Sequence, residues 1–268
     1  MHLIIDASCP HIPEEVTPAV SGTMEFNLLH ALGFSNEELP LAAWLASYHQ
    51  RAGEWVILSP IIWEATHNDA FINASGGDLL WSKEESHYWY QVFAEYFAAA
   101  GMKMHYHNTH IWLLENAAGH PLNSVPVHQT LNQSLMPLLS QLDEHLFWQK
   151  LITESQMLFA ANARKSAVNG LWPWGNAPLT VKAKKKLCVV PAYLSLAQHC
   201  CTEVEVYQPG LNLKNYEVLL LADINDLSPA HQKQIEQGSH SWYWNNVAYT
   251  VPKKNWLRHL WRKITHAD

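Results

Sequence analysis

The sequence has no apolar run long enough to cross a bilayer and no low-complexity segment. A transmembrane helix needs roughly 18 to 20 consecutive apolar residues, and no stretch approaches that length. Residues 1–15 also lack the basic region and the sustained apolar region of a secretory signal. We therefore expect a cytoplasmic protein with no transmembrane segment.

Cysteine and positive charge are both scarce. The four cysteines stand at positions 9, 188, 200 and 201, without C-x-x-C spacing or a plausible complete pairing, which favours free thiols in a reducing compartment. Acidic residues outnumber basic ones by 24 to 17, for a net charge of −7, so the chain as a whole repels a phosphate backbone. We expect no nucleic-acid partner.

Apolar and aromatic residues are plentiful. A hydrophobic content of 48% with 15% charged residues is typical of a folded globular chain. Thirteen tryptophans and seventeen histidines exceed ordinary usage. Because an indole buries a large apolar area, most of the tryptophans should lie in the core. Histidine titrates near neutrality, so solubility should vary with pH.

The pattern of apolar runs predicts the α/β class. Short runs at 2–6, 187–190 and 217–223 are continuously apolar, as expected of parallel strands covered on both faces, and 192–200 can form a crossover helix. We therefore expect a mainly parallel sheet flanked by helices. The organisation predicted is a single α/β domain over 1–268, with a smaller α+β portion at about 55–135.

The α+β portion and the region after it have clear local signals. Residues 54–75 should form two strands around a turn, and 102–116 a hairpin. Ser82 as N-cap with Glu85 three residues later predicts a helix over 82–101. Residues 137–164 form an amphipathic stripe that indicates one long helix or a pair, on which Asp143 and Glu144 should face water.

The stretch VNGLWPWGN at 168–176 combines two tryptophans, a proline and two glycines. It can form a strand end that turns Leu171 and Pro173 to one face and Trp172 and Trp174 to the other, followed by a turn at Gly175. Two interpretations stay open. The segment either lines a binding pocket or is a structural corner filled by two indoles.

Two ordered motifs carry a family resemblance that spans roughly residues 55–176. Gln156, Met157 and Leu158 precede an Asn-x-Leu-Trp-x-Trp-Gly segment, and together they resemble the regulatory protein RpfE-type family, which is similar to cofactor-independent phosphoglycerate mutases of the alkaline-phosphatase-like superfamily. The resemblance implies a pocket-lining strand. The ligand-binding candidates it gives are Asn169, Trp172, Trp174 and Gly175.

The resemblance also sets a test for catalysis. True mutases of that superfamily need a two-metal site of Asp and His ligands with a serine nucleophile. The weak candidates in this chain are Asp6, Ser8, Asp223, Asp226 and His231, without the expected Asp-His pairs. We therefore expect a non-catalytic or vestigial member with a regulatory or binding role and no cofactor. The alternative is a phosphomutase or phosphohydrolase that depends on a divalent metal, Mn or Zn, with these five residues converging.

Two further segments have an alternative function. His105 and His107 share one face of a predicted strand, and with His110 they are weak candidates for a zinc site, although exposed hairpin histidines are the preferred interpretation. The segment 253–264 predicts a basic helix with Trp256 and Trp261 on one face. That helix is a contact surface for a partner or a membrane surface, or it caps the core of the protein. The ligand or protein partner itself is unknown.

Overall fold

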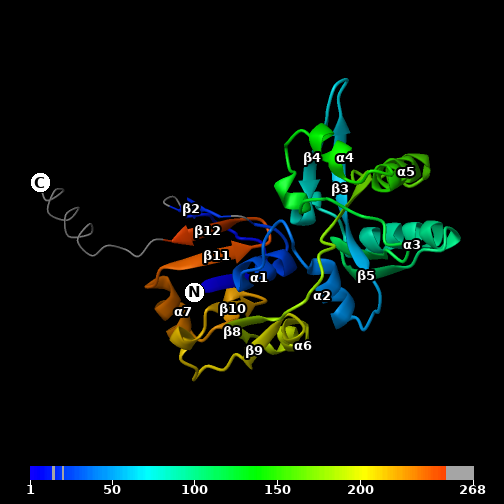
Figure 1. The fold of residues 1–268 in the computed structure, drawn as a ribbon. Coiled ribbons are helices and arrows are strands. Elements are labelled where there is room, and N and C mark those ends of the chain that lie inside the picture. The colour runs from blue at the N-terminus through cyan, green and yellow to red at the C-terminus, as the bar shows by residue number, and fades with distance from the viewer. Residues whose placement is uncertain (14–15, 20, 252–268) are drawn as a thin grey trace, which may run out of the picture. The chain divides into compact units, whose positions relative to one another are not determined.

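A computed structural model describes residues 1–13, 16–19 and 21–251 of the chain (Figure 1). The predicted helix at 253–264 lies outside the described residues. The chain divides into two compact units. The first unit comprises the described residues of 1–32 and 183–251, and the second comprises 33–182. Together they confirm the α/β class, with a mainly parallel sheet in one unit and an antiparallel sheet in the other.

The first unit is built on a seven-stranded sheet with the order β2-β12-β11-β1-β10-β8-β9. Five adjacent strands run parallel, from β11 to β9, and β12 and β2 add to the edge in antiparallel fashion. The strands are β1 (His2–Ile5), β2 (Thr17–Pro18), β8 (Ala183–Val189), β9 (Cys201–Val206), β10 (Val218–Leu221), β11 (His240–Trp244) and β12 (Ala248–Val251).

Both faces of the central strands of this sheet are covered. Leu3 and Leu219 are neighbours in the register of β1 and β10, and they pack with Ile235 of α7 (Pro229–Glu236). Tyr243 lies on the opposite face and contacts His30 of α1 (Met24–Leu32). Because side chains alternate along a strand, coverage on both sides requires every residue to be apolar. The remaining helices are α6 (Leu194–Gln198), η3 (Pro191–Tyr193), η4 (Leu213–Asn215) and η5 (Ile224–Asp226).

The second unit contains a five-stranded antiparallel sheet around the long strand β3. Strand β3 pairs with β4, β6 and β7, and β5 pairs with β6. The strands are β3 (Trp55–Ala65), β4 (Ala70–Ser75), β5 (Met104–Asn108), β6 (Ile111–Glu115) and β7 (Gly170–Trp174). The two strands predicted in 54–75 and the hairpin predicted in 102–116 are therefore confirmed, and the portion expected at 55–135 lies within this unit.

The helices of the second unit follow their sequence signals closely. Helix α3 (Lys83–Ala99) begins after Ser82, whose side chain accepts a hydrogen bond from the Glu85 backbone N–H at 3.1 Å. The stripe at 137–164 forms a pair, α4 (Met136–Gln141) and α5 (Phe147–Ala161). The other helices are α2 (Leu41–Tyr48), η1 (Gly76–Leu79) and η2 (Val127–Gln129).

Indole and phenyl rings build the core of the second unit. Phe93 of α3 lies 5.0 Å from Phe159 of α5 and 6.0 Å from Trp112 of β6, measured between ring centroids. Among the described residues six tryptophans are fully buried, which confirms that much of the unusual tryptophan content serves packing. They are Trp44, Trp89, Trp112, Trp148, Trp172 and Trp174. All six belong to the second unit.

All four cysteines are free and buried. Burial raises the pKa of the Cys188 thiol to about 12, so this group stays protonated and unreactive near neutral pH. A membrane-spanning helix is not found among residues 1–13, 16–19 and 21–251, since none there is both long and apolar enough.

Candidate functional site

The carboxyl ends of the parallel strands in the first unit bring several predicted side chains to one edge of the sheet. Ligands of open α/β sheets usually bind at this edge. Asp6 follows β1, and its carboxylate accepts hydrogen bonds from the Tyr193 hydroxyl at 2.7 Å and from the Asn245 side-chain amide at 2.9 Å. Ser8 is exposed in the same loop. Tyr193 and Asn245 follow β8 and β11, and no local sequence signal links either residue to Asp6.

Negative charge surrounds the Tyr193 hydroxyl. Its pKa is raised mainly by burial, then by the hydrogen bond to Asp6 and by the charges of Asp6, Glu25 and Asp226. The hydroxyl therefore stays protonated near neutral pH and acts as a hydrogen-bond donor to Asp6. The charges of Asp6 and Asp226, two of the five residues in the enzyme hypothesis, therefore both act on the Tyr193 hydroxyl.

The carboxylates of Asp223 and Asp226 are already used by the loop that carries them. One oxygen of Asp226 accepts the backbone N–H groups of Ala222 and Asp223, each at 2.9 Å. Asp223 in turn accepts the Asn225 N–H at 2.8 Å, and the two acids form a reciprocal capping box around η5. Both side chains therefore have a structural role at the start of this short helix.

His231 is held in the interior rather than at the edge of the sheet. Its Nε2 atom lies 2.9 Å from the Leu211 carbonyl, which can only accept, so the ring proton resides on Nε2. Its Nδ1 atom then accepts from the Tyr207 hydroxyl at 2.8 Å, and that hydroxyl accepts the Ser228 N–H at 2.9 Å. The side chain is 7% exposed and both of its nitrogens are satisfied.

These five residues do not fit a two-metal centre as they stand. Asp226 shares an oxygen with two amides, Asp223 is directed into its own loop, and both ring nitrogens of His231 are occupied. Within the part of the chain that the structure describes, no three His, Cys, Asp or Glu side chains are arranged to hold a metal ion. We therefore derive no metal-dependent step at this edge.

In the second unit, β7 contains the core of the VNGLWPWGN stretch. Trp172 and Trp174 are both buried, and their indole N–H groups donate to the Val125 carbonyl at 3.0 Å and to the Ser59 hydroxyl at 2.8 Å. The Asn169 side chain accepts from the Trp63 backbone N–H at 2.6 Å and donates to the Trp63 carbonyl at 2.8 Å, which extends the ladder beyond the strand. Each of these groups has a structural partner.

Gly175 ends β7 in a conformation that favours glycine. Its φ is +72°, and a Cβ at this position would lie 3.1 Å from Ile57 and 3.4 Å from Leu41. Its carbonyl accepts the Ala42 backbone N–H of α2 at 2.9 Å. Strand β7 ends at Trp174, and a side chain at position 175 would be both strained and crowded.

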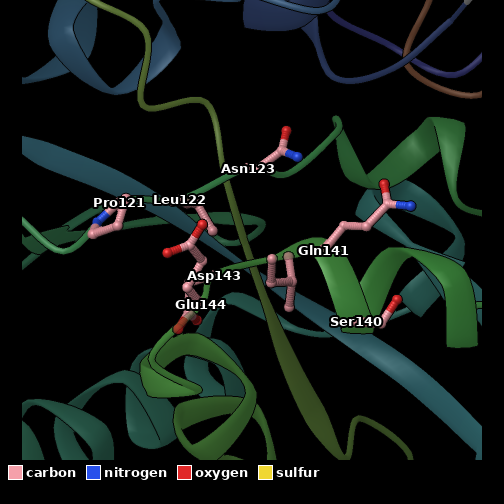
Figure 2. A pocket seen from close by; sticks show the side chains of 8 residues that line it. Pro121, Leu122, Asn123, Ser140, Gln141, Asp143 and Glu144 are labelled. Atoms are coloured by element: carbon pink, nitrogen blue, oxygen red, sulfur yellow. The ribbon is translucent and has the colours of Figure 1, made fainter.

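Two cavities that share lining residues lie near Gly175, and we call them together the trough. One has a volume of about 490 Å³ and includes Trp174 and Gly175 in its lining. Its other lining residues are Asn36, Glu37, Glu38, Leu39, Leu122, Asn123, Ser124, Pro126, Asn176, Ala177, Pro178 and Thr180. The other cavity, of about 720 Å³, shares Leu122 and Asn123 and is lined also by Pro121, Ser140, Gln141, Leu142, Asp143 and Glu144 (Figure 2).

The wall of the trough formed by residues 121–125 has no regular secondary structure, yet side chains from three other segments hold it through its carbonyl oxygens. The Trp148 indole donates to the Pro121 carbonyl at 2.9 Å. Trp172 donates to Val125, and the Asn176 amide donates to the Leu122 carbonyl at 3.1 Å. Trp172 therefore fixes the wall, whereas Trp174 and Gly175 line the space.

Asp143 corrects one sequence prediction, that this side chain faces water on a long helix. It is only 8% exposed and lies in the turn between α4 and α5. Its two oxygens accept the backbone N–H groups of Phe147 and Trp148 at 2.9 and 2.8 Å. The reason is that a helix start needs acceptors for its first N–H groups, and Asp143 supplies them to α5. Glu144 is exposed, as predicted.

The predicted imidazole pair is also brought into contact with other groups. His105 and His107 lie on β5, and the imidazole beside them is His49, which follows α2. His110 lies in the turn between β5 and β6 and its backbone N–H donates to Asn108. The His49 contact was not predicted, because nothing local in the sequence links position 49 to position 107. The metal search over the described residues finds no site here either.

Three comparisons with known proteins return one weak similarity. No protein-family model matches the chain, and no curated protein matches its sequence. A search of solved structures finds weak similarity to a cofactor-independent phosphoglycerate mutase from Thermoplasma acidophilum. The TM-score is 0.28 with 9% sequence identity, over 90% of this chain and 79% of that one. A similarity of this size defines neither a family nor an activity.

Proposed function

We propose that this chain is a non-catalytic, phosphoglycerate-mutase-like protein with a regulatory or binding role, and that its ligand occupies the trough of the second unit. The observation that carries the proposal is the lining of the trough. Trp174 and Gly175, which the motif resemblance gives as ligand-binding residues, border a cavity of about 490 Å³. Sites for small molecules commonly have volumes of roughly 300 to 1,000 Å³.

The charge of the trough indicates the class of ligand. Its lining contains Glu37, Glu38 and Glu144 as exposed acids, together with amide and hydroxyl side chains, and among the described lining residues there is no Lys or Arg. Such a lining repels phosphate and carboxylate groups and attracts a positive charge. We therefore propose a small polar amine as the ligand, rather than a phosphoglycerate.

The experiment compares three small probes of different charge on the full chain by calorimetry: putrescine as a diamine, inositol as a neutral polyol, and 3-phosphoglycerate as an anion. We expect putrescine to bind most tightly and Glu38→Gln to weaken it several-fold. Glu95→Gln, which removes an exposed acid from α3 outside the trough, is the matched control and should have no effect. Tightest binding of 3-phosphoglycerate, with both variants unchanged, would refute the proposal.

The alternative function is a phosphomutase or phosphohydrolase at the carboxyl edge of the first unit. The observation in its favour is that Asp6, Glu25 and Asp226 all act on the Tyr193 hydroxyl. Its test is hydrolysis of a generic phosphomonoester with added Mn²⁺ or Zn²⁺. Metal-dependent turnover that disappears in Ser8→Ala would favour this enzyme over the binding role.

A further inference from the structure

The end of α2 and strand β5 bring three imidazoles and one guanidinium together. His49 Nε2 lies 2.8 Å from His107 Nδ1, and Arg51 Nη2 lies 3.3 Å from His105 Nδ1. The rings of His49 and His105 are 4.2 Å apart between centroids. We call His49, Arg51, His105 and His107 the imidazole cluster; it lies on the second unit and shares no residue with the trough.

The hydrogen bonds of the cluster leave one donor unused. Arg51 can only donate, so His105 Nδ1 must accept and the proton of this neutral ring resides on Nε2. That Nε2 atom is buried and has no hydrogen-bond partner. A buried N–H without an acceptor is costly to a fold. Because Arg51 occupies Nδ1, the Nε2–H is left to donate to an acceptor from outside the chain, such as a water molecule or an anion.

The charges that lower the pKa values of His49 and His105 are all positive. The pKa of His49 is lowered to about 4, first by burial and then by His105, His107 and Arg51, and no carboxylate acts on it to raise the value. The pKa of His105 is lowered by burial, Arg51 and His107. Tyr48 contacts the ring of His49 edge-on. Within the described ranges Arg51 forms no ion pair, although the chain carries a net charge of −7.

We propose that the imidazole cluster binds a phosphate-type oxyanion, with the exposed Arg51 guanidinium as its charged anchor and the imidazole N–H groups as further donors. A planar guanidinium fork fits the oxygens of such an anion and makes charge-assisted hydrogen bonds to them. An anion would add a negative charge beside His49 and His105, on which only positive charges act. Binding therefore favours the protonated forms of these two imidazoles, and the affinity rises as the pH falls.

A transition metal explains the cluster less well. Two nitrogens bound to one tetrahedral zinc ion stand roughly 3.3 Å apart, because each Zn–N bond is about 2.0 to 2.1 Å. The 2.8 Å between His49 and His107 is instead a hydrogen-bond distance, in which one ring donates to the other. The charge of Arg51 beside His105 also disfavours a dication.

The test uses sulfate on the full chain, because sulfate keeps its double charge between pH 6 and pH 8 and any pH dependence must then come from the protein. Binding is measured by calorimetry against sodium chloride of equal ionic strength, together with the NMR signals of the histidine rings. We expect sulfate to bind more tightly at pH 6 than at pH 8 and to shift the signals of His49, His105 and His107.

The decisive variant is Arg51→Gln, which removes the anchor at an exposed position and should weaken sulfate binding by about tenfold or more. Arg164→Gln is the matched control, since Arg164 is exposed and contacts Tyr88 elsewhere on the unit, and it should change nothing. Equal effects of sulfate and chloride, or unchanged binding in Arg51→Gln, would overturn the proposal. So would zinc binding that is lost in His49→Asn while sulfate has no effect.

Discussion

In the first unit the acids at the carboxyl edge accept hydrogen bonds from neighbouring groups, whereas in the second unit several acids and amides face cavities. Asp223 and Asp226 cap η5, and Asp6 accepts from Tyr193 and Asn245. Glu37 and Glu38 instead lie at an exposed rim of the trough. The comparison shows that the type of residue at a strand end is a weak guide to chemistry. A better guide is whether the carboxylate oxygens already accept hydrogen bonds from neighbouring groups of the protein.

The largest expected effect is the loss of stability when Trp172, which holds the wall of the trough in the second unit, is replaced. Replacing it with alanine removes a buried indole and the donor that holds Val125, so the free energy of unfolding should fall by about 3 to 5 kcal/mol. Urea unfolding followed by circular dichroism measures it. Met157→Ala, at a position 66% exposed on α5, should leave stability nearly unchanged. A similar small loss for both variants would mean that Trp172 does not fix the wall.

A smaller effect is expected from His231 in the first unit. His231→Ala leaves the Tyr207 hydroxyl and the Leu211 carbonyl without their partner in the interior, and we expect a loss of about 2 to 3 kcal/mol in the free energy of unfolding. His145→Ala, at an exposed position, is the control. If His231→Ala unfolded like the parent protein but lost metal-dependent phosphatase activity, the residue would belong to a catalytic centre and the contrast between the units would fail.

The smallest effect concerns pH and the imidazole cluster. The pKa of His49 in the folded protein is lowered to about 4 from an ordinary value near 6.5, so the fold favours the neutral ring. Its contribution to stability is complete above pH 6.5 and is lost as the pH falls from there toward 4, because the unfolded chain then takes up the proton first.

After allowance for solvent around a half-exposed ring, this loss amounts to about 1 kcal/mol. The measurement is the difference in urea stability between the parent protein and His49→Asn at pH 7.5 and at pH 5, in a buffer without sulfate or phosphate. Because other histidines titrate in the same range, only this difference is informative. If the stability difference between the parent protein and His49→Asn did not change with pH, the pKa of His49 would not be lowered by the fold.

Much of the fold could be predicted because its signals are local. Ser82 and Glu85 mark the start of α3, and the continuous apolar run of β10 indicates a strand covered on both faces. The capping role of Asp223 and Asp226 could also be predicted from the sequence, since acids three residues apart after a strand are typical of a capping box. The enzyme hypothesis had assigned the same pair to metal binding.

The candidate sites were harder to predict because their members are distant in the sequence. His49 meets His107 across 58 positions, and Asn176 meets Leu122 across 54. Periodicity reports which face of an element is buried, but not which two elements meet. The motif at 169–175 indicated a pocket-lining strand and was ambiguous about the indoles. In the structure both indoles are buried with their N–H groups bonded, and Trp174 also borders a cavity.

The wall at 121–125 has one consequence for how this protein could diversify. The side chains that hold the wall donate hydrogen bonds to main-chain carbonyl oxygens, which every amino acid possesses. These bonds therefore do not depend on which side chains the wall residues carry. Under the proposed binding role, substitutions at Asn123 or Ser124 would alter which molecule is recognised while the backbone trace persists. Related chains could change specificity there at little risk to folding.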